Sequence, residues 1–233
     1  MTEVRVINNI VKEYPTMFKV CSFKHPRIYV NDGGVKRVKE IVGDDYIPKL
    51  SSLSRTKTLI HDLILCNDFD LFCTFTFDPE KVDRFNFNAC SYKVSRWIHH
   101  QKEKSPDMKY LIVPEQHKSG AWHFHALISQ YKGTLRDSKH TSSTGRRVYN
   151  ITSYRSGFST AVKIDDREAV AVYVSKYITK DFIRMFNRRR FACSRNLIRP
   201  TKYINSDILK NTLPLFKEKI YEDQDFFYYS IIP

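Results

Sequence analysis

The sequence predicts an α+β fold in which helices pack on a central antiparallel sheet. Its patterns occur in the order strand, helix, several strands and helix, which is typical of this class. The 233 residues, 42% hydrophobic and 27% charged, are near globular averages and are enough to bury a core without disulfides. With 7 glycines and no glycine-rich phosphate-binding motif, the chain gives no support for an onboard ATP motor.

Residues 1–69 are predicted to be an N-terminal extension without a functional motif. Residues 18–23 and 27–30 have the composition of short strands, and residues 31–34 carry a strong turn signal. Residues 54–65 place apolar side chains at helical spacing and predict a short helix.

Residues 70–204 are predicted to form the main domain, and residues 205–233 a C-terminal extension. Residues 71–77 alternate in polarity and predict the first strand. A helix is expected from about Pro79 to Lys104, because proline suits a first helical turn. Further strands are expected over residues 108–113, 122–129, 147–152 and 158–164.

The connecting segments complete the predicted domain. Residues 118–120 suit a hairpin turn, and the polar, basic residues 132–147 are expected to form a loop. Asp165 and Glu168 have the spacing of a capping box, which predicts a helix from there to about Asn187.

The charge of the chain indicates a polyanionic partner. Lys and Arg number 39 against 25 Asp and Glu, giving a formal net charge of +14. No apolar run approaches the roughly 20 residues that span a bilayer, and the start lacks the apolar stretch of a signal peptide. The 5 cysteines are scattered without a C-x-x-C pair, which argues against zinc fingers and for a reducing compartment. We therefore expect a cytoplasmic nucleic-acid-binding protein that does not act at a membrane.

Two histidines separated by one residue are the strongest chemical signal. Because alternate residues of a strand face opposite sides, His123 and His125 should project together while Phe124 points into the core. Two imidazoles on one face can bind a metal ion. The same pattern suits two polar residues on a solvated strand face, so the pair alone leaves both interpretations open.

A carboxylate upstream favours the metal interpretation. An antiparallel hairpin would bring Glu115 back beside His123 and His125. Two imidazoles and one carboxylate would leave coordination positions open, which suits Mg²⁺ or Mn²⁺ together with a phosphate oxygen. His117 is a competing ligand, but a hard divalent ion favours the oxygen of Glu115.

Two tyrosines follow in the second predicted helix. At about 100° per residue, Tyr173, Lys176, Tyr177 and Lys180 share one face, opposite an apolar stripe that begins at Ala171. Neighbouring ammonium groups would favour the phenolate form and stabilise charge on a phosphate. Two tyrosines on an ordinary amphipathic surface helix remain the alternative.

Together these motifs resemble HUH-type rolling-circle replication initiators of phages and plasmids. Residues 123–125 match the His-hydrophobic-His motif, and Glu115 matches the acidic third ligand of many initiators. Residues 173–180 resemble the two-tyrosine motif, and residues 72–77 the first-strand motif. Residues 190–200 resemble a segment that follows the tyrosine helix.

The resemblance implies an HUH endonuclease fold with an RRM-like or ferredoxin-like core. It implies a divalent ion, Mg²⁺ or Mn²⁺, and site-specific nicking and joining of single-stranded origin DNA, with a hairpin as the expected substrate. Tyr177 would make the first cut through a 5′-phosphotyrosine, Tyr173 would serve the terminating transfer, and Lys176 and Lys180 would assist. Because no helicase domain follows, a host helicase and polymerase are expected in a bacterial cytoplasm.

Basic residues near the tyrosines are expected to contact DNA phosphates, although a solvated helix end would have a similar composition. The predicted contacts are Arg184, Arg188, Arg189, Arg190 and Arg195. Alternative functions are a transposase or relaxase of the same superfamily and a non-catalytic DNA-binding regulator. A barrel-type zinc hydrolase is disfavoured, because too few residues follow His125 for most of a barrel of roughly 250 residues.

Overall fold

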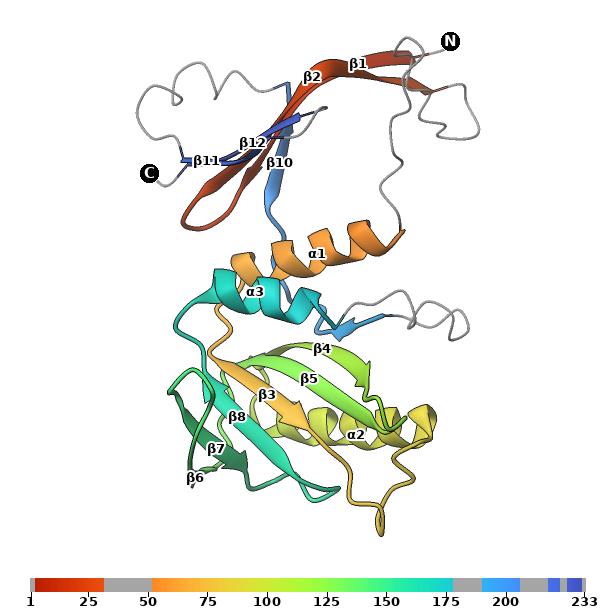
Figure 1. Ribbon diagram of the computed structural model, residues 1–233, viewed down its shortest axis with the longest axis vertical. Coiled ribbons are helices and arrows are strands. Elements are labelled where there is room, and N and C mark those ends of the chain that lie inside the picture. The colour runs from red at the N-terminus through yellow and green to blue at the C-terminus, as the bar shows by residue number, and fades with distance from the viewer. Residues whose placement is uncertain (1–2, 32–51, 178–189, 206–217, 223–225, 232–233) are drawn as a thin grey trace. The chain divides into compact units, whose positions relative to one another are not determined.

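A computed structural model describes residues 3–31, 52–177, 190–205, 218–222 and 226–231 (Figure 1). The chain divides into two units, which are described separately below. One unit contains Leu50–Ile198, and the other combines Met1–Lys49 with Arg199–Pro233.

The unit 50–198 is built on an antiparallel sheet in the order β6-β7-β8-β3-β5-β4-β9. Its strands are β3 (Leu71–Phe75), β4 (Lys109–Gln116), β5 (Trp122–Ser129), β6 (Leu135–Thr141), β7 (Arg147–Ile151), β8 (Ser159–Lys163) and β9 (Ala192–Cys193). The helix α2 (Phe87–Lys104) connects β3 to β4, and β5 lies between these two strands. This is the split βαβ arrangement of ferredoxin-like folds. The predicted α+β fold with a central antiparallel sheet is therefore confirmed.

Apolar side chains cover both faces of this sheet. On one face Phe124 lies in a buried cluster with Trp97 of α2. On the other face Leu127 lies in a cluster with Ile64 of α1 (Ser52–Cys66) and Val174 of α3 (Arg167–Ser175). Figure 1 shows α2 behind β3, β5 and β4, and α1 beside α3. Alternation along each strand thus sends neighbouring residues into two different cores.

Most of the predicted elements of this unit are present. The strand expected over residues 122–129 matches β5, and the helix expected over residues 54–65 corresponds to α1. The strand expected over residues 108–113 extends to Gln116. The predicted hairpin turn is present, with Gly120 at a φ of +86° that glycine adopts without strain.

The helix predicted from about Pro79 begins instead at Phe87. Side-chain oxygens of Asp78 and Asp83 each accept a hydrogen bond from the backbone N–H two residues ahead, which stabilises turns. Asn86 then caps the helix by accepting from two backbone N–H groups of its first turn. Local hydrogen bonding by these short polar side chains delays the helix.

The loop predicted over residues 132–147 is wrong, because it contains β6. This strand is irregular: its register with β7 shifts between Asp137 and Thr141, and Lys139 has a φ of +62°. A side-chain oxygen of Asp137 accepts from the N–H of Lys139 at 2.9 Å. The bulge and the polar composition of the strand hide its alternation in the sequence.

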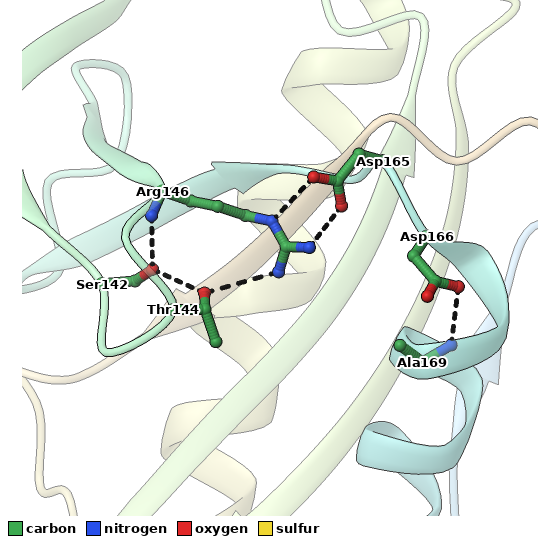
Figure 2. Close-up of polar contacts among 6 residues, drawn as sticks. All are labelled: Ser142, Thr144, Arg146, Asp165, Asp166 and Ala169. Atoms are coloured by element: carbon green, nitrogen blue, oxygen red, sulfur yellow. Dashed lines mark hydrogen bonds and ion pairs between the residues drawn. The ribbon is translucent and has the colours of Figure 1, made fainter.

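The capping residue of α3 is Asp166, one position after the residue predicted from the capping-box spacing. Asp166 accepts from the N–H of Ala169 at 2.9 Å, whereas Asp165 forms an ion pair with Arg146, whose Nε lies 3.0 Å from the carboxylate (Figure 2). In the described residues α3 ends at Ser175, and the rest of the helix expected up to Asn187 lies outside them, apart from a turn that ends at residue 177.

The other unit contains an antiparallel sheet in the order β10-β1-β2-β12-β11. Its strands are β1 (Glu3–Glu13), β2 (Phe18–Asn31), β10 (Thr201–Ile204), β11 (Glu218–Glu222) and β12 (Phe226–Ile231). The two short strands expected within residues 18–30 form the single strand β2. Val11 and Val20 make a small buried cluster where β1 pairs with β2. In neither unit do the described residues include a helix with the length and apolar character that a membrane crossing requires.

Candidate active site

Three adjacent strands bring the predicted metal ligands to one face of the sheet. In register, His123 of β5 lies opposite Glu115 of β4, and His125 lies opposite Thr74 of β3. Phe124 points to the other face and is buried, as the alternation predicted. His125 is only 7% exposed, so it does not lie on a solvated strand face.

His125 is held by hydrogen bonds at both ring nitrogens. Its Nε2 lies 2.7 Å from Oε2 of Glu115, and its Nδ1 lies 3.2 Å from Oγ1 of Thr74. The hydrogen bond to His125 holds the pKa of Glu115 below its ordinary value, so this carboxylate is ionised and can only accept. Nε2 of a neutral His125 therefore donates to Glu115, and Nδ1 accepts from the hydroxyl of Thr74. The ring orientation is fixed from two strands.

Thr74 is a functional candidate that the sequence did not reveal. It belongs to a strand that was predicted, and its residue type carries no metal or nucleophile chemistry of its own. Its role depends on β3 pairing with β5 at the register that sets Thr74 opposite His125. That register is a property of the folded sheet.

His123 has different surroundings. Its ring stacks on that of His117, with 5.6 Å between the ring centres, and it is half-buried. Burial lowers the pKa of His123, so its imidazole is neutral at neutral pH, which is the form that binds metal ions. His117 is exposed, and its Nδ1 accepts from the N–H of Ser119 at 3.3 Å.

The donor atoms partly converge toward a cation site. Nε2 of His125 and Oε2 of Glu115 already face one another, and both are donor types that divalent ions accept. His123 lies opposite Glu115 in the strand pair and would be the third donor. Within the part of the chain that the structure describes, no three His, Cys, Asp or Glu side chains are close enough to form a complete metal site. The residues fit a divalent ion by chemistry, with two of the three donors in contact.

Both predicted tyrosines lie beside this histidine. The ring of Tyr177 stacks on that of His125, with 3.8 Å between centres and an interplanar angle of 14°. The ring of Tyr173 meets that of Tyr177 edge-on at 5.3 Å and is 45% exposed. Phe72 contacts both groups, at 5.8 Å from the ring of His125 and 5.6 Å from that of Tyr173. Residues far apart in the sequence thus form one cluster of rings.

Tyr177 packs toward the sheet, contrary to the helical projection that placed it opposite the apolar stripe. Its N–H bonds to the carbonyl of Val174 at 3.1 Å, three residues back, so the chain tightens after α3. In such a turn the side chains at i and i+3 eclipse one another. Because Val174 is buried in the core, Tyr177 is directed to the same side.

Burial, rather than nearby ammonium groups, dominates the ionisation of Tyr177. Burial raises its pKa above the ordinary value of 10, and a hydrogen bond with Tyr173 and the charge of Glu115 raise it further. The phenolate form expected from the sequence is therefore disfavoured at Tyr177. Nζ of Lys176 lies 5.6 Å from the ring centre of Tyr173, so the nearer cation accompanies the exposed tyrosine.

The predicted basic contacts are only partly covered. Lys180, Arg184, Arg188 and Arg189 lie outside the described residues. Nη1 of Arg190 donates to Oγ1 of Thr56 on α1 at 2.8 Å, so this arginine also has a structural contact. Arg195 is exposed and follows β9, which pairs with β4.

A comparison with known protein families agrees with this geometry. Residues 70–182 match a family model described as replication-associated protein, of the ORF2 type. The matched span includes β3, the β4–β5 hairpin and both tyrosines. No curated protein and no solved structure matches the chain. The family match supports a role in the initiation of replication.

Proposed function

We propose that the protein is a metal-dependent tyrosine endonuclease that nicks and rejoins single-stranded DNA at a replication origin. The contact between the rings of Tyr177 and His125 carries this proposal, because it places a nucleophile against a histidine that is hydrogen-bonded to a carboxylate. The match to replication-associated proteins supports the biological setting, and the net charge of +14 supports a polyanionic substrate.

The proposed reaction is a transfer of one phosphodiester bond. The phenol oxygen of Tyr177 forms a bond to phosphorus, and the bond from phosphorus to the 3′ oxygen of the preceding nucleotide breaks. The phenol proton passes to solvent, and the departing 3′ oxygen takes up a proton to give a free hydroxyl. The DNA remains attached to the protein through a 5′-phosphotyrosine, so rejoining needs no ATP.

Three side chains would hold the cation in this proposal. Mg²⁺ or Mn²⁺ bound by Glu115, His123 and His125 would polarise an oxygen of the scissile phosphate as a Lewis acid. Glu115 supplies an ionised oxygen, and His123 supplies a neutral imidazole because burial lowers its pKa. The hydroxyl of Thr74 orients His125 by its contact with Nδ1.

The second tyrosine gives the proposed initiator a way to finish. Tyr173 lies edge-on to Tyr177, so both could reach one phosphate by small adjustments. After a host polymerase has extended the 3′ end and a host helicase has separated the strands, Tyr173 attacks the regenerated junction. The released 3′ hydroxyl then attacks the first phosphotyrosine and closes a circle. Lys176 beside Tyr173 stabilises negative charge on the phosphate.

Tyr→Phe variants test the proposal, because they remove only the phenol hydroxyl. Purified protein with Mn²⁺ is incubated with single strands that carry hairpins from the DNA flanking its coding sequence, and covalent adducts are resolved on a denaturing gel. We expect Tyr177→Phe to lose the adduct, and Tyr173→Phe to keep it but release fewer closed circles. Tyr92→Phe, on the exposed side of α2, is the matched control.

The outcomes separate the parts of the proposal. An adduct that persists in Tyr177→Phe but is lost in Tyr173→Phe would reverse the order of the tyrosines. Full nicking in excess EDTA would refute the role of the metal. If wild-type protein forms no adduct on any of these strands, while still binding them, a non-catalytic regulator would replace the endonuclease.

A further inference from the structure

An exposed aromatic ring lies beside the hairpin that carries Glu115 and His123. Phe85 is 55% exposed, and its Cδ1 lies 3.6 Å from the position that a Cβ would occupy on Gly120. Gly120 belongs to the turn between β4 and β5. The ring therefore lies against the backbone of this turn while much of its surface stays open to solvent.

The backbone around this ring is held in place. The carbonyl of Arg84 accepts from the N–H of Trp122 at 2.8 Å, which fastens the segment to the start of β5. The N–H of Phe85 donates to Oδ1 of Asp83 at 3.0 Å, and the following residue, Asn86, caps α2. A ligand that used this ring would lose little entropy in ordering the loop.

A cation accompanies the ring. The guanidinium carbon of Arg84 lies 5.4 Å from the ring centre of Phe85. Arg84 is also close enough to the proposed metal ligands to act on His123, whose pKa is lowered first by burial and further by nearby cations that include Arg84. The pair thus offers a flat apolar surface and a positive charge beside the site.

Single exposed hydrophobic residues are common on protein surfaces and need no explanation. Phe85 differs because aromatic groups continue from it toward the site. The N–H of Gly120, beneath the ring of Phe85, donates to the carbonyl of His117 at 2.8 Å. The ring of His117 in turn stacks on that of His123. The surface therefore runs from Phe85 across the turn to the proposed scissile phosphate.

We propose that Arg84 and Phe85 form a subsite for single-stranded DNA next to the reacting phosphate. An unpaired base stacks on the ring of Phe85, and Arg84 binds a backbone phosphate beside that base. Bases in a duplex have no open face for such stacking, so the subsite selects unpaired strands. The inference rests on the proposed function, which supplies the single-stranded substrate.

Binding and nicking are measured separately on Phe85→Leu, Phe85→Trp and Arg84→Gln. Fluorescence anisotropy with labelled oligo(dA) and oligo(dT) in EDTA reports binding without cleavage. Phe85→Leu keeps apolar packing on the turn but loses the aromatic face, and we expect affinity to fall about fivefold to thirtyfold. Phe85→Trp should restore it, and Arg84→Gln should reduce the log–log salt slope by about 0.7.

Tyr92→Leu is the matched control, because Tyr92 is 57% exposed and lies 5.8 Å from Arg96 on the outer side of α2. Equal loss of affinity in Tyr92→Leu and Phe85→Leu, or no loss in Phe85→Leu, would overturn the subsite. A wild-type protein that binds neither oligonucleotide would overturn it as well. If binding depends on Phe85 but no strand is nicked in Mn²⁺, the subsite stands and the endonuclease fails. If nicking is normal in Phe85→Leu at limiting DNA, the reverse holds.

Discussion

Replacement of Thr74 by valine tests how the candidate active site is organised. Valine keeps the shape and strand preference of threonine but cannot hydrogen-bond to Nδ1 of His125. The hydroxyl of Thr74 can both donate and accept, so it serves two states of this ring. It donates when Nε2 carries the hydrogen that bonds Glu115, and it accepts when Nε2 binds a metal and Nδ1 is protonated.

The expected magnitude follows from burial. His125 is 7% exposed, so water does not readily replace the lost hydroxyl, and a buried group without a partner costs about 1–3 kcal/mol. Removal of such an outer hydrogen-bond partner of a metal ligand lowers metal affinity by about 10- to 100-fold. We therefore expect Thr74→Val to bind Mn²⁺ about 10- to 100-fold more weakly and to need correspondingly more Mn²⁺ for half-maximal nicking.

Isothermal titration of Mn²⁺ into wild-type and variant protein measures this change. Thr74→Ser keeps the hydroxyl and should restore most of the affinity. Thr160→Val is the matched control, because Thr160 lies opposite Thr74 in the neighbouring strand β8, one strand further from His125. Equal Mn²⁺ affinity in Thr74→Val and wild type would refute the orienting role. An equal loss in Thr160→Val would indicate a general disturbance of the sheet.

Two further predictions concern charge. The pKa of Glu115 lies below its ordinary value of 4.5, so its contribution to stability is present above that pH and is lost as the pH falls through the lowered pKa. Thermal unfolding of metal-free protein should therefore show a difference between wild type and Glu115→Gln that shrinks below pH 4.5, and a constant difference would contradict the hydrogen bond to His125. Arg195→Ala should lower the log–log salt slope for single-stranded DNA by about 0.7, and Arg190→Ala by less because Arg190 bonds Thr56. Equal slopes in wild type and Arg195→Ala would place Arg195 outside the DNA path.

The strongly alternating segments could be predicted from the sequence. Residues 122–129 form β5 at the predicted bounds, because one apolar face and one chemically distinct face fix both its type and its orientation. β6 was not predictable in this way, since a bulge at Lys139 breaks its period and most of its side chains are polar. The late start of α2 depends on side-chain hydrogen bonds of Asp78, Asp83 and Asn86, which compete locally with helix formation.

The residue types of the candidate site could be predicted better than their directions. The two-residue period placed His123 and His125 on one face, but it could not show that His125 is buried or that Thr74 lies opposite it. The helical projection failed at Tyr177, because it assumed a regular α-helix where the chain tightens into a turn with i to i−3 bonding. Both features depend on tertiary pairing and on the helix end, which a single sequence pattern does not encode.

Mass spectrometry of the trapped protein–DNA adduct tests the central claim most directly. Wild-type protein is incubated in Mn²⁺ with a single-stranded hairpin substrate whose cut releases the short 3′-hydroxyl fragment, so that the reaction cannot reverse. After digestion with protease and nuclease, we expect a nucleotide attached through its 5′ phosphate to the peptide that contains Tyr177. A nucleotide attached through its 3′ phosphate, or cut strands with both ends free of protein, would contradict the account.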